Sequence, residues 1–367
     1  MSRVAITKCT SYRQEEVYQA LKKVLENSDV PDVRGKKVLL KPNILSDSPA
    51  SSCITTNPEI VRSAIKLFFE RGASEIYVGD SPGLQTSSFS GKTCGIYDVC
   101  QEEGAVWTDF STSPTPTLIK GTSQTLPLAS ILKEGVLTIS ICKFKTHQLM
   151  YTTGAVKNLF GLVPGLNKSP CHLANPTRES FAKLIVGIHN TVQPSFAIMD
   201  AVLGMEGPGP ANGKPKLVGL IMSSDNLFAL DYAQAVIMGY KPNDIPILNE
   251  GKRQHLLPQN IDFPLLNAEN LVINDYERIK LSRKTNLLTS LVIPFFTRGY
   301  HKKKQKKEPA PLFNENKCIH CAKCINICPA KALSFNEKKA VVADYDKCIR
   351  CYCCHEMCPA DAISINQ

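Results

Sequence analysis

The sequence CIHCAKCINICPAKALSF, residues 318–335, is followed by the related sequence CIRCYCCHEMCPADAISI, residues 348–365. The two stretches are identical at nine of eighteen positions, and both have the spacing C-x2-C-x2-C-x3-C-P. Three thiolates on one tight loop can reach three irons of a cubic cluster, whereas structural zinc sites normally use two separated CxxC pairs. The duplicated four-cysteine pattern therefore predicts iron–sulfur clusters rather than zinc at this end of the chain.

This spacing and its duplication resemble those of the bacterial two-cluster ferredoxins. In that arrangement the fourth cysteine of each run binds the cluster of the other run. Cys353 falls outside the pattern, and we expect it to be a packed thiol. The resemblance implies two 4Fe–4S clusters with two sets of ligands: Cys318, Cys321, Cys324 and Cys358 for cluster one, and Cys348, Cys351, Cys354 and Cys328 for cluster two.

The composition is that of an ordinary globular protein with a positive net charge. The 367 residues are 43% hydrophobic and carry a formal charge of +10, and they contain no run of eighteen apolar residues. The first residues, MSRVAITKC, lack the basic and apolar regions of an export signal. Nine of the fifteen cysteines lie between Cys318 and Cys358, which indicates metal ligation in a reducing compartment rather than disulfides. We expect a soluble, cytoplasmic protein.

Some of the positive charge is concentrated in the run RGYHKKKQKK, residues 298–307. Blocks of like charge repel one another and stay solvated, so we interpret this run as part of a linker. A nucleic-acid patch, which we do not expect, and a steering or membrane-surface site are the alternatives. The apolar segment 287–296 is too short to span a bilayer. The predicted divisions are a large domain (1–296), a linker (297–311) and a ferredoxin domain (312–367).

Short aliphatic runs alternate with helical patterns through the large domain. Such alternation predicts an α/β domain with a mainly parallel sheet, beside a small α+β ferredoxin-like domain. Pro58 fits the first turn of a helix after Asn57, and Asp225 is a candidate cap of the helix that follows it. The predicted strands are 38–40, 76–79, 137–142, 196–199 and 217–222, and the predicted helices are 15–25, 58–70, 178–190 and 226–238.

Polar residues follow several of the predicted strands. Lys41, Asp80, Lys143 and Asp200 occupy such positions. The carboxyl ends of parallel strands meet at one edge of a sheet, where ligands bind. Loops are polar by default, so one such residue alone would carry little weight. Four of them, with both signs of charge, predict a site at this edge.

The segment ICKFKTH places three cationic or proton-active side chains two residues apart: Lys143, Lys145 and His147. On a strand they would project from the same face, where burial without an anion would be costly. In TTGAVKNLFGLVPG (152–165) a glycine leads into Lys157 and Asn158, and such a turn can present backbone N–H groups to a phosphate or carboxylate. Neither a P-loop nor a GxGxxG motif is present, so an anion site is predicted without ATP or NAD.

Other candidates follow in the second half of the large domain. His172, with His147 and the nearby lysines, makes proton transfer at neutral pH chemically available, and a structural histidine is the alternative. The loop GMEGPGPANGKP, residues 204–215, is predicted to be an irregular lid or an ordinary surface loop. We expect buried thiols at four cysteines that lack CxxC spacing: Cys94, Cys100, Cys142 and Cys171.

Six motifs run through the large domain: LLKPN (39–43), TTNP (55–58), GDSPG (79–83), KFKTH (143–147), TGAVKNLFGLVPG (153–165) and GMEGPGP (204–210). Together they resemble the domain-of-unknown-function family 362, in the subtype that ends in a two-cluster ferredoxin. The resemblance spans nearly the whole chain. It implies the order of the domains and an iron–sulfur oxidoreductase role, but no substrate.

The main hypothesis is a redox enzyme. A redox partner protein or reductant would supply electrons to the clusters, and a small anionic substrate or cofactor in the large domain would receive them. The alternatives are a non-catalytic electron-transfer protein whose large domain docks a partner enzyme and, with less support, a nucleic-acid binder; a flavin or a further metal is left open. The predicted catalytic residues are Lys143, Lys145, His147, Lys157 and His172, and the predicted cofactor-binding residues are Lys41, Asn43, Asp80, Asn158 and Asp200.

Overall fold

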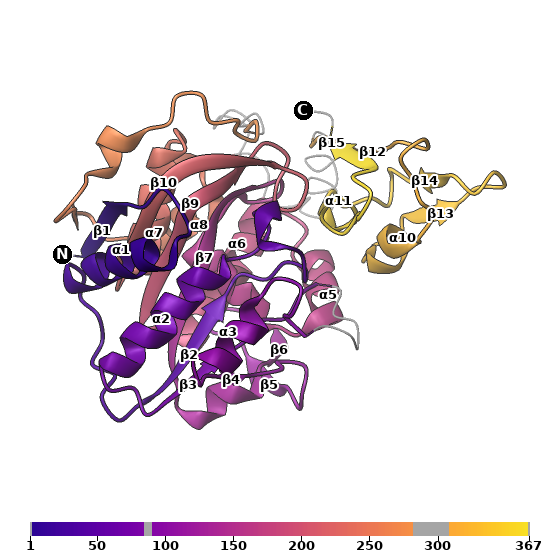
Figure 1. Ribbon diagram of the computed structural model, residues 1–367. Coiled ribbons are helices and arrows are strands. Elements are labelled where there is room, and N and C mark those ends of the chain that lie inside the picture. Colours follow the sequence, from indigo (N-terminus) through magenta and orange to yellow (C-terminus); the bar gives the residue numbers. More distant parts are fainter. Residues whose placement is uncertain (1, 84–89, 282–307, 366–367) are drawn as a thin grey trace.

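A nine-stranded mixed sheet forms the centre of the large domain (Figure 1). The computed structural model describes residues 2–83, 90–281 and 308–365, so the basic run 298–307 and the apolar segment 287–296 lie outside the described residues. The strand order is β11-β1-β10-β9-β7-β2-β3-β4, with β8 paired to β7. The strands are β1 (Ser2–Lys8), β2 (Lys37–Pro42), β3 (Glu75–Val78), β4 (Val106–Trp107), β7 (Leu137–His147), β8 (Tyr151–Thr153), β9 (Phe196–Glu206), β10 (Lys214–Ser224) and β11 (Ile261–Asp262).

The predicted parallel core of the sheet is confirmed. The neighbours β9, β7, β2, β3 and β4 all run parallel, whereas β10 is antiparallel to both β9 and β1. The carboxyl ends of β9, β7, β2 and β3 therefore lie at one edge of the sheet. A separate hairpin is formed by β5 (Thr115–Leu118) and β6 (Thr125–Leu128).

Helices cover both faces of the sheet because its buried strands are apolar on both sides. Val38 and Leu40 pack with α1, α2 and α3, while Leu39, between them, packs into the core with α4, α6, α7 and α8. Among the described residues, no helix has the length and apolar character needed to cross a membrane. The helices are α1 (Gln14–Glu26), α2 (Pro58–Glu70), α3 (Ile96–Glu102), α4 (Ala155–Asn158), α5 (Lys168–Ala174), α6 (Arg178–Val192), α7 (Leu227–Ile237) and α8 (Pro246–Arg253).

Side-chain caps begin three of these helices. Asn57 accepts a hydrogen bond from the backbone N–H of Glu59 and precedes Pro58, as predicted for α2. Thr177 and Ser180 form a reciprocal capping box at α6. The predicted cap of α7 is wrong by one residue, because Asn226, not Asp225, accepts the hydrogen bond from Ala229.

The loop predicted over residues 204–215 is mostly a hairpin. Antiparallel pairing of β9 with β10 aligns Glu206 with Lys214 and Met205 with Pro215, which leaves only residues 207–213 as the connection. The prediction of a loop is therefore wrong for residues 204–206 and 214–215, which are paired strands, and is confirmed for residues 207–213. The glycines and prolines that suggested it lie partly in paired strands.

The C-terminal domain repeats one unit with an offset of thirty residues. Each unit has a strand, a cysteine-rich loop, a short helix and a second strand. The units pair with each other, β12 with β15 and β13 with β14, all antiparallel. The elements are β12 (Pro311–Phe313), α10 (Lys323–Ile327) and β13 (Leu333–Phe335), then β14 (Val341–Ala343), α11 (Cys353–Glu356) and β15 (Ile363–Ile365).

The C-terminal domain lies against the large domain through α11 and the end of α10, and β13 and β14 lie farther away (Figure 1). The Ser169 hydroxyl donates a hydrogen bond to the Ile327 carbonyl at 2.8 Å. The Asn212 side chain donates to the His355 carbonyl at 3.3 Å. An ion pair between Arg178 and Glu308, at 3.1 Å, also joins the large domain to the start of the C-terminal segment.

Candidate functional site

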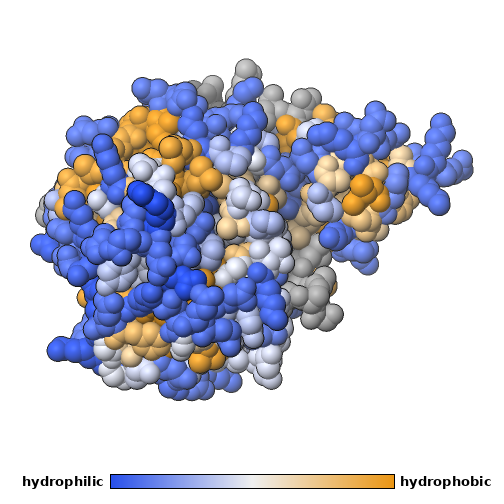
Figure 2. All heavy atoms as spheres, in the orientation of Figure 1, coloured by the Kyte–Doolittle hydropathy of each residue, from blue (hydrophilic) through white to orange (hydrophobic). Residues whose placement is uncertain are grey.

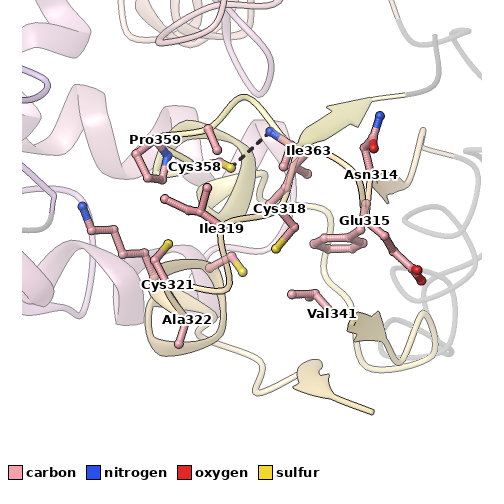
Figure 3. Close-up of a pocket in the computed structure, with 15 residues that line it drawn as sticks. Asn314, Glu315, Cys318, Ile319, Cys321, Ala322, Val341, Cys358, Pro359 and Ile363 are labelled. Carbon is pink, nitrogen blue, oxygen red and sulfur yellow. Dashed lines mark hydrogen bonds between the residues drawn. The ribbon is translucent and has the colours of Figure 1, made fainter. Parts of the chain in front are cut away.

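Two cavities in the C-terminal domain are each lined by four of the repeated cysteines. Cys318, Cys321, Cys324 and Cys358 line the first cavity (Figure 3), and Cys328, Cys348, Cys351 and Cys354 line the second. The fourth cysteine of each run thus lies with the first three of the other run. This grouping is the one that the ferredoxin resemblance implies.

The backbone around these cysteines fits 4Fe–4S clusters. Ala322 and Tyr352, one in each loop, have the positive φ values of 59° and 64°, which let the loops curl tightly. The backbone N–H of Ala332 points to the sulfur of Cys328, and that of Ala362 to the sulfur of Cys358, both at 3.3 Å. Such N–H groups stabilise cluster-bound sulfur. In the part of the chain that the structure describes, no three His, Cys, Asp or Glu side chains are placed to hold a single metal ion.

A further cavity, the junction pocket, lies between the two domains. One of its lining residues, Cys353, also lines the second cysteine cavity, so the two cavities share a wall. Lys41, Lys143, Lys145 and Asp200 do not line it. Six predicted residues do, namely Asn43, Asp80, His147, Lys157, Asn158 and His172, together with Ser81, Thr153, Phe160 and Lys168 of the large domain and Ile327, Cys353, Glu356 and Met357 of the C-terminal domain.

His147 is held in one neutral tautomer. Its Nδ1 accepts hydrogen bonds from the backbone N–H groups of Leu149 (3.1 Å) and Met150 (3.3 Å). The remaining proton therefore lies on Nε2, which is 3.2 Å from Oε1 of Glu356. Burial and the neighbouring Lys157 lower the pKa of His147 well below its usual value. This ring is uncharged at neutral pH, which disfavours its predicted role as a proton source.

Two lysines near the pocket lack full compensation of their charge. The Nζ atom of Lys145 donates a hydrogen bond to the Ile54 carbonyl at 2.7 Å, and burial with the nearby Lys157 lowers the pKa of Lys145 strongly. Burial also lowers the pKa of Lys157, although Glu356 acts in the opposite direction. Burial raises the pKa of the Glu356 carboxyl, against the influence of the same lysines. A bound anion would supply the counter-charge that these ammonium groups lack.

Lys168 belongs to the pocket, although no prediction from the sequence included it. Its Nζ atom donates a hydrogen bond to the Ser81 carbonyl at 2.7 Å, and burial lowers the pKa of Lys168 to about 7. The Ser81 hydroxyl accepts a hydrogen bond from the N–H of Gly165 at 2.7 Å, which joins the GDSPG motif to the end of the TGAVKNLFGLVPG motif. The signal available in the sequence was the position of Lys168, three residues after that second motif.

His172 fits the structural alternative better than the catalytic one. Its ring stacks on Phe181, with centroids 4.3 Å apart and an interplanar angle of 15°, and meets Phe160 edge-on. Burial, with a smaller effect from Lys157, lowers the pKa of His172 to about 3. The ring is therefore a neutral wall of the pocket at physiological pH.

Lys41 does not line the junction pocket but contacts residues that do. Its Nζ atom is 2.8 Å from Asp80 Oδ1 and donates to the Pro42 carbonyl (2.8 Å) and to Asn158 Oδ1 (3.1 Å), which uses all three of its protons. Burial lowers the pKa of Lys41, and Asp80 opposes that effect. Asn43 donates to the same Asn158 oxygen, at 3.2 Å. Lys41 therefore positions Asn158 and Asp80 and does not itself face a ligand.

Lys143 and Asp200 form a separate buried network. Lys143 Nζ lies 2.7 Å from Asp200 Oδ2 and 2.9 Å from the Tyr12 hydroxyl. That hydroxyl donates to Asp200 Oδ1 at 2.8 Å, and the Asn57 N–H donates to Oδ2 at 2.9 Å. The prediction that all four charged residues follow strand ends is wrong for Lys143 and Asp200, because β7 and β9 continue past them to His147 and Glu206. The four residues form two internal ion pairs instead of one open site. Direct pairing of Lys143 with Asp200 across β7 and β9 causes this.

The glycine-led turn at Gly154 binds a carboxyl group that belongs to the protein. The backbone N–H groups of Ala155 and Val156 donate to the two carboxyl oxygens of Asp231, at 2.5 and 3.1 Å. A Cβ atom on Gly154 would collide with that carboxyl group, so only glycine fits there. The turn does present its N–H groups to a carboxyl group, as its sequence suggested, but this group belongs to Asp231 and not to a ligand. The turn also places Lys157 and Asn158 in the pocket.

The remaining cysteines are buried thiols. Cys94, Cys100, Cys142 and Cys171 are all buried in the large domain, as predicted. Cys353 is also buried, in agreement with the prediction of a packed thiol, but its place between two cavities was not foreseen.

Comparison with known proteins finds a family match in each of the two regions. Residues 38–236 match the family described as a domain of unknown function (DUF362), and residues 317–362 match a 4Fe-4S dicluster domain. The "Thylakoid-associated protein sll1697" of Synechocystis sp. (strain ATCC 27184 / PCC 6803 / Kazusa) is 30% identical over 284 residues, which cover 75% of this chain and 87% of that protein.

A crystal structure of a protein from Thermotoga maritima aligns with a TM-score of 0.39 and 12% identity, over 62% of this chain and 59% of that one. This likeness is too weak to support an argument. The sequence matches, in contrast, cover more than half of the chain. The protein therefore belongs to the family defined by the domain of unknown function DUF362, joined here to a C-terminal 4Fe-4S dicluster domain.

Proposed function

We propose that this protein is an oxidoreductase in which the junction pocket binds a small anionic substrate or cofactor and reduces it with electrons from the C-terminal domain. The wall that Cys353 shares between the pocket and the second cysteine cavity carries this proposal. When bound by the two cysteine sets, two 4Fe–4S clusters would supply electrons singly and at low potential. The large domain then provides the binding site for their acceptor.

The pocket has the chemistry to hold an anion next to an apolar group. Lys157 and Lys168 supply positive charge, and Asn43 and Asn158 supply amide groups. Phe160, Ile327 and Met357 form apolar parts of the lining. We infer a small carboxylate or phosphate ester whose charged end lies between the two lysines.

Lys168 is the best-placed proton donor in this pocket. With a pKa of about 7 it is partly protonated at neutral pH, the range in which general acids work well. The Nε2–H group of His147 is available as a hydrogen-bond donor to the substrate, and the neutral ring of His172 forms part of the pocket wall. Reduction should slow as the pH rises through 7, because Lys168 then loses its proton.

Stopped-flow reduction kinetics test the proposal. The full chain, assembled with iron and sulfide without oxygen and reduced with dithionite, is mixed with a panel of small carboxylates and phosphate esters while cluster absorbance is followed. At least one compound should reoxidise the wild type about tenfold or more faster than the Lys157→Gln/Lys168→Gln variant, as expected for the loss of a charge-assisted contact.

The matched control is Lys183→Gln, an exposed lysine of α6, which should behave as the wild type. Equal rates for all three proteins with every compound would contradict the proposal and favour an electron-transfer protein whose large domain docks another enzyme. The predicted cytoplasmic location remains part of this proposal. Cell fractionation tests it, since the relative from Synechocystis is described as thylakoid-associated.

A further inference from the structure

We propose that the outer face of the C-terminal domain is the docking surface for an acidic electron-carrier protein. We call it the cluster-one face, because it borders the first cysteine cavity, and define it by Ile319, Lys323, Phe335, Lys338 and Lys339. This inference rests on the proposed function only in that an oxidoreductase needs an electron donor. It adds the place where the donor binds and the chemistry that selects it.

The centre of the face is apolar and exposed. Ile319 is 62% exposed and Phe335 38%, high values for large apolar side chains. Phe335 pairs with Val341, which lines the cavity, so both side chains lie on the same face of the β13–β14 hairpin. Figure 2 shows hydrophobic atoms gathered on this outer part of the molecule, with hydrophilic residues around them. An apolar centre with a polar rim is typical of surfaces that bind other proteins.

Loop contacts bring these residues to the edge of the cysteine cavity. A contact of 2.9 Å between His320 Nδ1 and the Lys339 carbonyl holds the β13–β14 hairpin against the first cysteine loop. The His320 ring lies near the ring of Phe335, with centroids 6.3 Å apart. Lys323 and Val341 line the cavity itself, and Cys321 is exposed. A protein bound here would therefore touch the wall of the first cysteine cavity.

The charge of the domain is divided between its two repeats. Residues 312–340 contain five lysines and two glutamates, whereas residues 341–365 contain two basic and four acidic residues. Lys323, Lys338 and Lys339 are exposed, and none of them forms an ion pair with another described residue. A rim of lysines without counter-charges attracts an acidic partner and speeds its encounter.

The opposite side of the domain is already occupied by the large domain. Glu356 lies against His147, and the carbonyls of Ile327 and His355 accept hydrogen bonds from large-domain side chains. The hairpin of β13 and β14, which carries Phe335, Lys338 and Lys339, lies on the far side of the C-terminal domain from the large domain (Figure 1). In the reaction, one electron leaves the partner's redox centre and enters the centre held by the first cysteine set, and no bond is made or broken.

A protein carrier fits these observations better than a lipid surface. The three lysines border an exposed apolar centre beside a cysteine cavity, so the binding surface and the point of electron entry coincide. An anionic membrane would match the charge but would supply no electron. A second copy of the chain would meet the same positive charge on its own face.

Binding of flavodoxin, an acidic one-electron carrier, tests the inference on the full chain assembled with iron and sulfide. The test variant is Lys323→Glu/Lys338→Glu/Lys339→Glu. The control is Lys22→Glu/Lys23→Glu/Lys36→Glu, which makes the same change in charge at exposed lysines of the large domain. Dissociation constants and association rates are measured at about 50 mM and about 500 mM salt, the range over which screening of surface charge grows strongly.

At low salt the test variant should bind flavodoxin about tenfold or more weakly than the wild type, mainly through slower association, and the difference should shrink at high salt. The control should stay within about twofold of the wild type. Equal binding by both variants would overturn the inference. Binding of phosphatidylglycerol vesicles in place of flavodoxin would also overturn it. So would a dimer of the wild-type protein that is lost in the test variant.

Failure of this inference can be told apart from failure of the proposed function. With dithionite as the reductant, the test variant should reoxidise with pocket substrates at the wild-type rate, because its junction pocket is intact. Loss of flavodoxin binding with unchanged dithionite-driven reoxidation supports the docking surface. Loss of dithionite-driven reoxidation in the test variant alone would show that the substitutions disturb the domain itself and would overturn the assignment of these lysines to docking.

Discussion

A buried ammonium group is stable only when nearby groups balance its charge, and the lysines in and around the junction pocket differ in this respect. Lys143 has both a carboxylate and a hydroxyl within hydrogen-bonding distance. Lys157 and Lys168 have no carboxylate at such a distance among the described residues, and burial lowers the pKa of both. Lys143 therefore stabilises the fold, whereas Lys157 and Lys168 are available to a ligand.

Substitution of Lys143 should therefore cost stability. Lys143→Met leaves the buried Asp200 carboxylate without its partner, so the free energy of unfolding should fall by about 3–5 kcal/mol. Urea unfolding followed by the fluorescence of Trp107, the single tryptophan, measures this in the large domain. The double variant Lys143→Met/Asp200→Leu should recover part of the loss. An unchanged unfolding midpoint in Lys143→Met would contradict the structural role.

The neutral ring of His172 predicts a pH dependence of stability. The unfolded chain binds a proton at this residue below about pH 6.5, whereas the folded chain, with a pKa of about 3, does not. Stability should therefore fall as the pH drops from 6.5, by up to about 1.4 kcal/mol per pH unit for this residue. His172→Phe should melt with a weaker dependence on pH between 7 and 5. Parallel curves for the two proteins would count against a buried neutral histidine.

At the scale of elements, α4 is the short helix that carries Lys157 and Asn158 into the pocket. It is only four residues long, and its first N–H groups are satisfied by Asp231 of α7. Burial raises the pKa of that carboxyl to about 7, against the effect of the two N–H donors. The Asp231 side chain of α7 thus fixes the start of α4, the helix that positions Lys157 and Asn158 in the junction pocket.

Removal of this carboxyl should loosen α4. Asp231→Ala leaves two buried N–H groups without acceptors, so we expect a loss of about 1–3 kcal/mol in unfolding free energy. Asp98→Ala, at an exposed position of α3, is the matched control and should change stability little. Hydrogen exchange at Ala155 and Val156 should also speed up in Asp231→Ala. Unaltered exchange there would show that another group holds α4.

At the scale of the molecule, the two domains have unequal cores. The large domain has two extensive apolar clusters, one on each face of its sheet. The core of the C-terminal domain contains five buried side chains, of which two are cysteines, packed against further cysteines. A domain of this size with so few apolar contacts depends on its metal for stability.

Removal of iron should therefore unfold one domain and spare the other. After chelation, trypsin should cleave at lysines within residues 312–367, while fragments of residues 1–281 remain protected. Mass spectrometry of the digests distinguishes these regions, and reassembly with iron and sulfide should restore resistance. Equal rates of cleavage in both domains, or none in the C-terminal one, would contradict this dependence.

The sequence alone predicted the features that depend on local spacing. The duplicated cysteine runs, the alternation of strands and helices and the proline start of α2 all follow from residues close together in the chain, where periodicity and backbone chemistry act directly. The mainly parallel character of the sheet followed from the same alternation, whereas the order of its strands did not. These are properties that a short stretch carries with it wherever it is placed.

Only the tertiary structure decided which charges are paired and which are free. Lys143 meets Asp200 and Lys41 meets Asp80 because the register of neighbouring strands brings them together. Lys168 becomes part of the site because the chain returns to Ser81, and Cys353 completes the wall because the C-terminal domain folds back over the sheet edge. The energy of a buried charge depends on its surroundings in space, and those surroundings come from distant parts of the sequence.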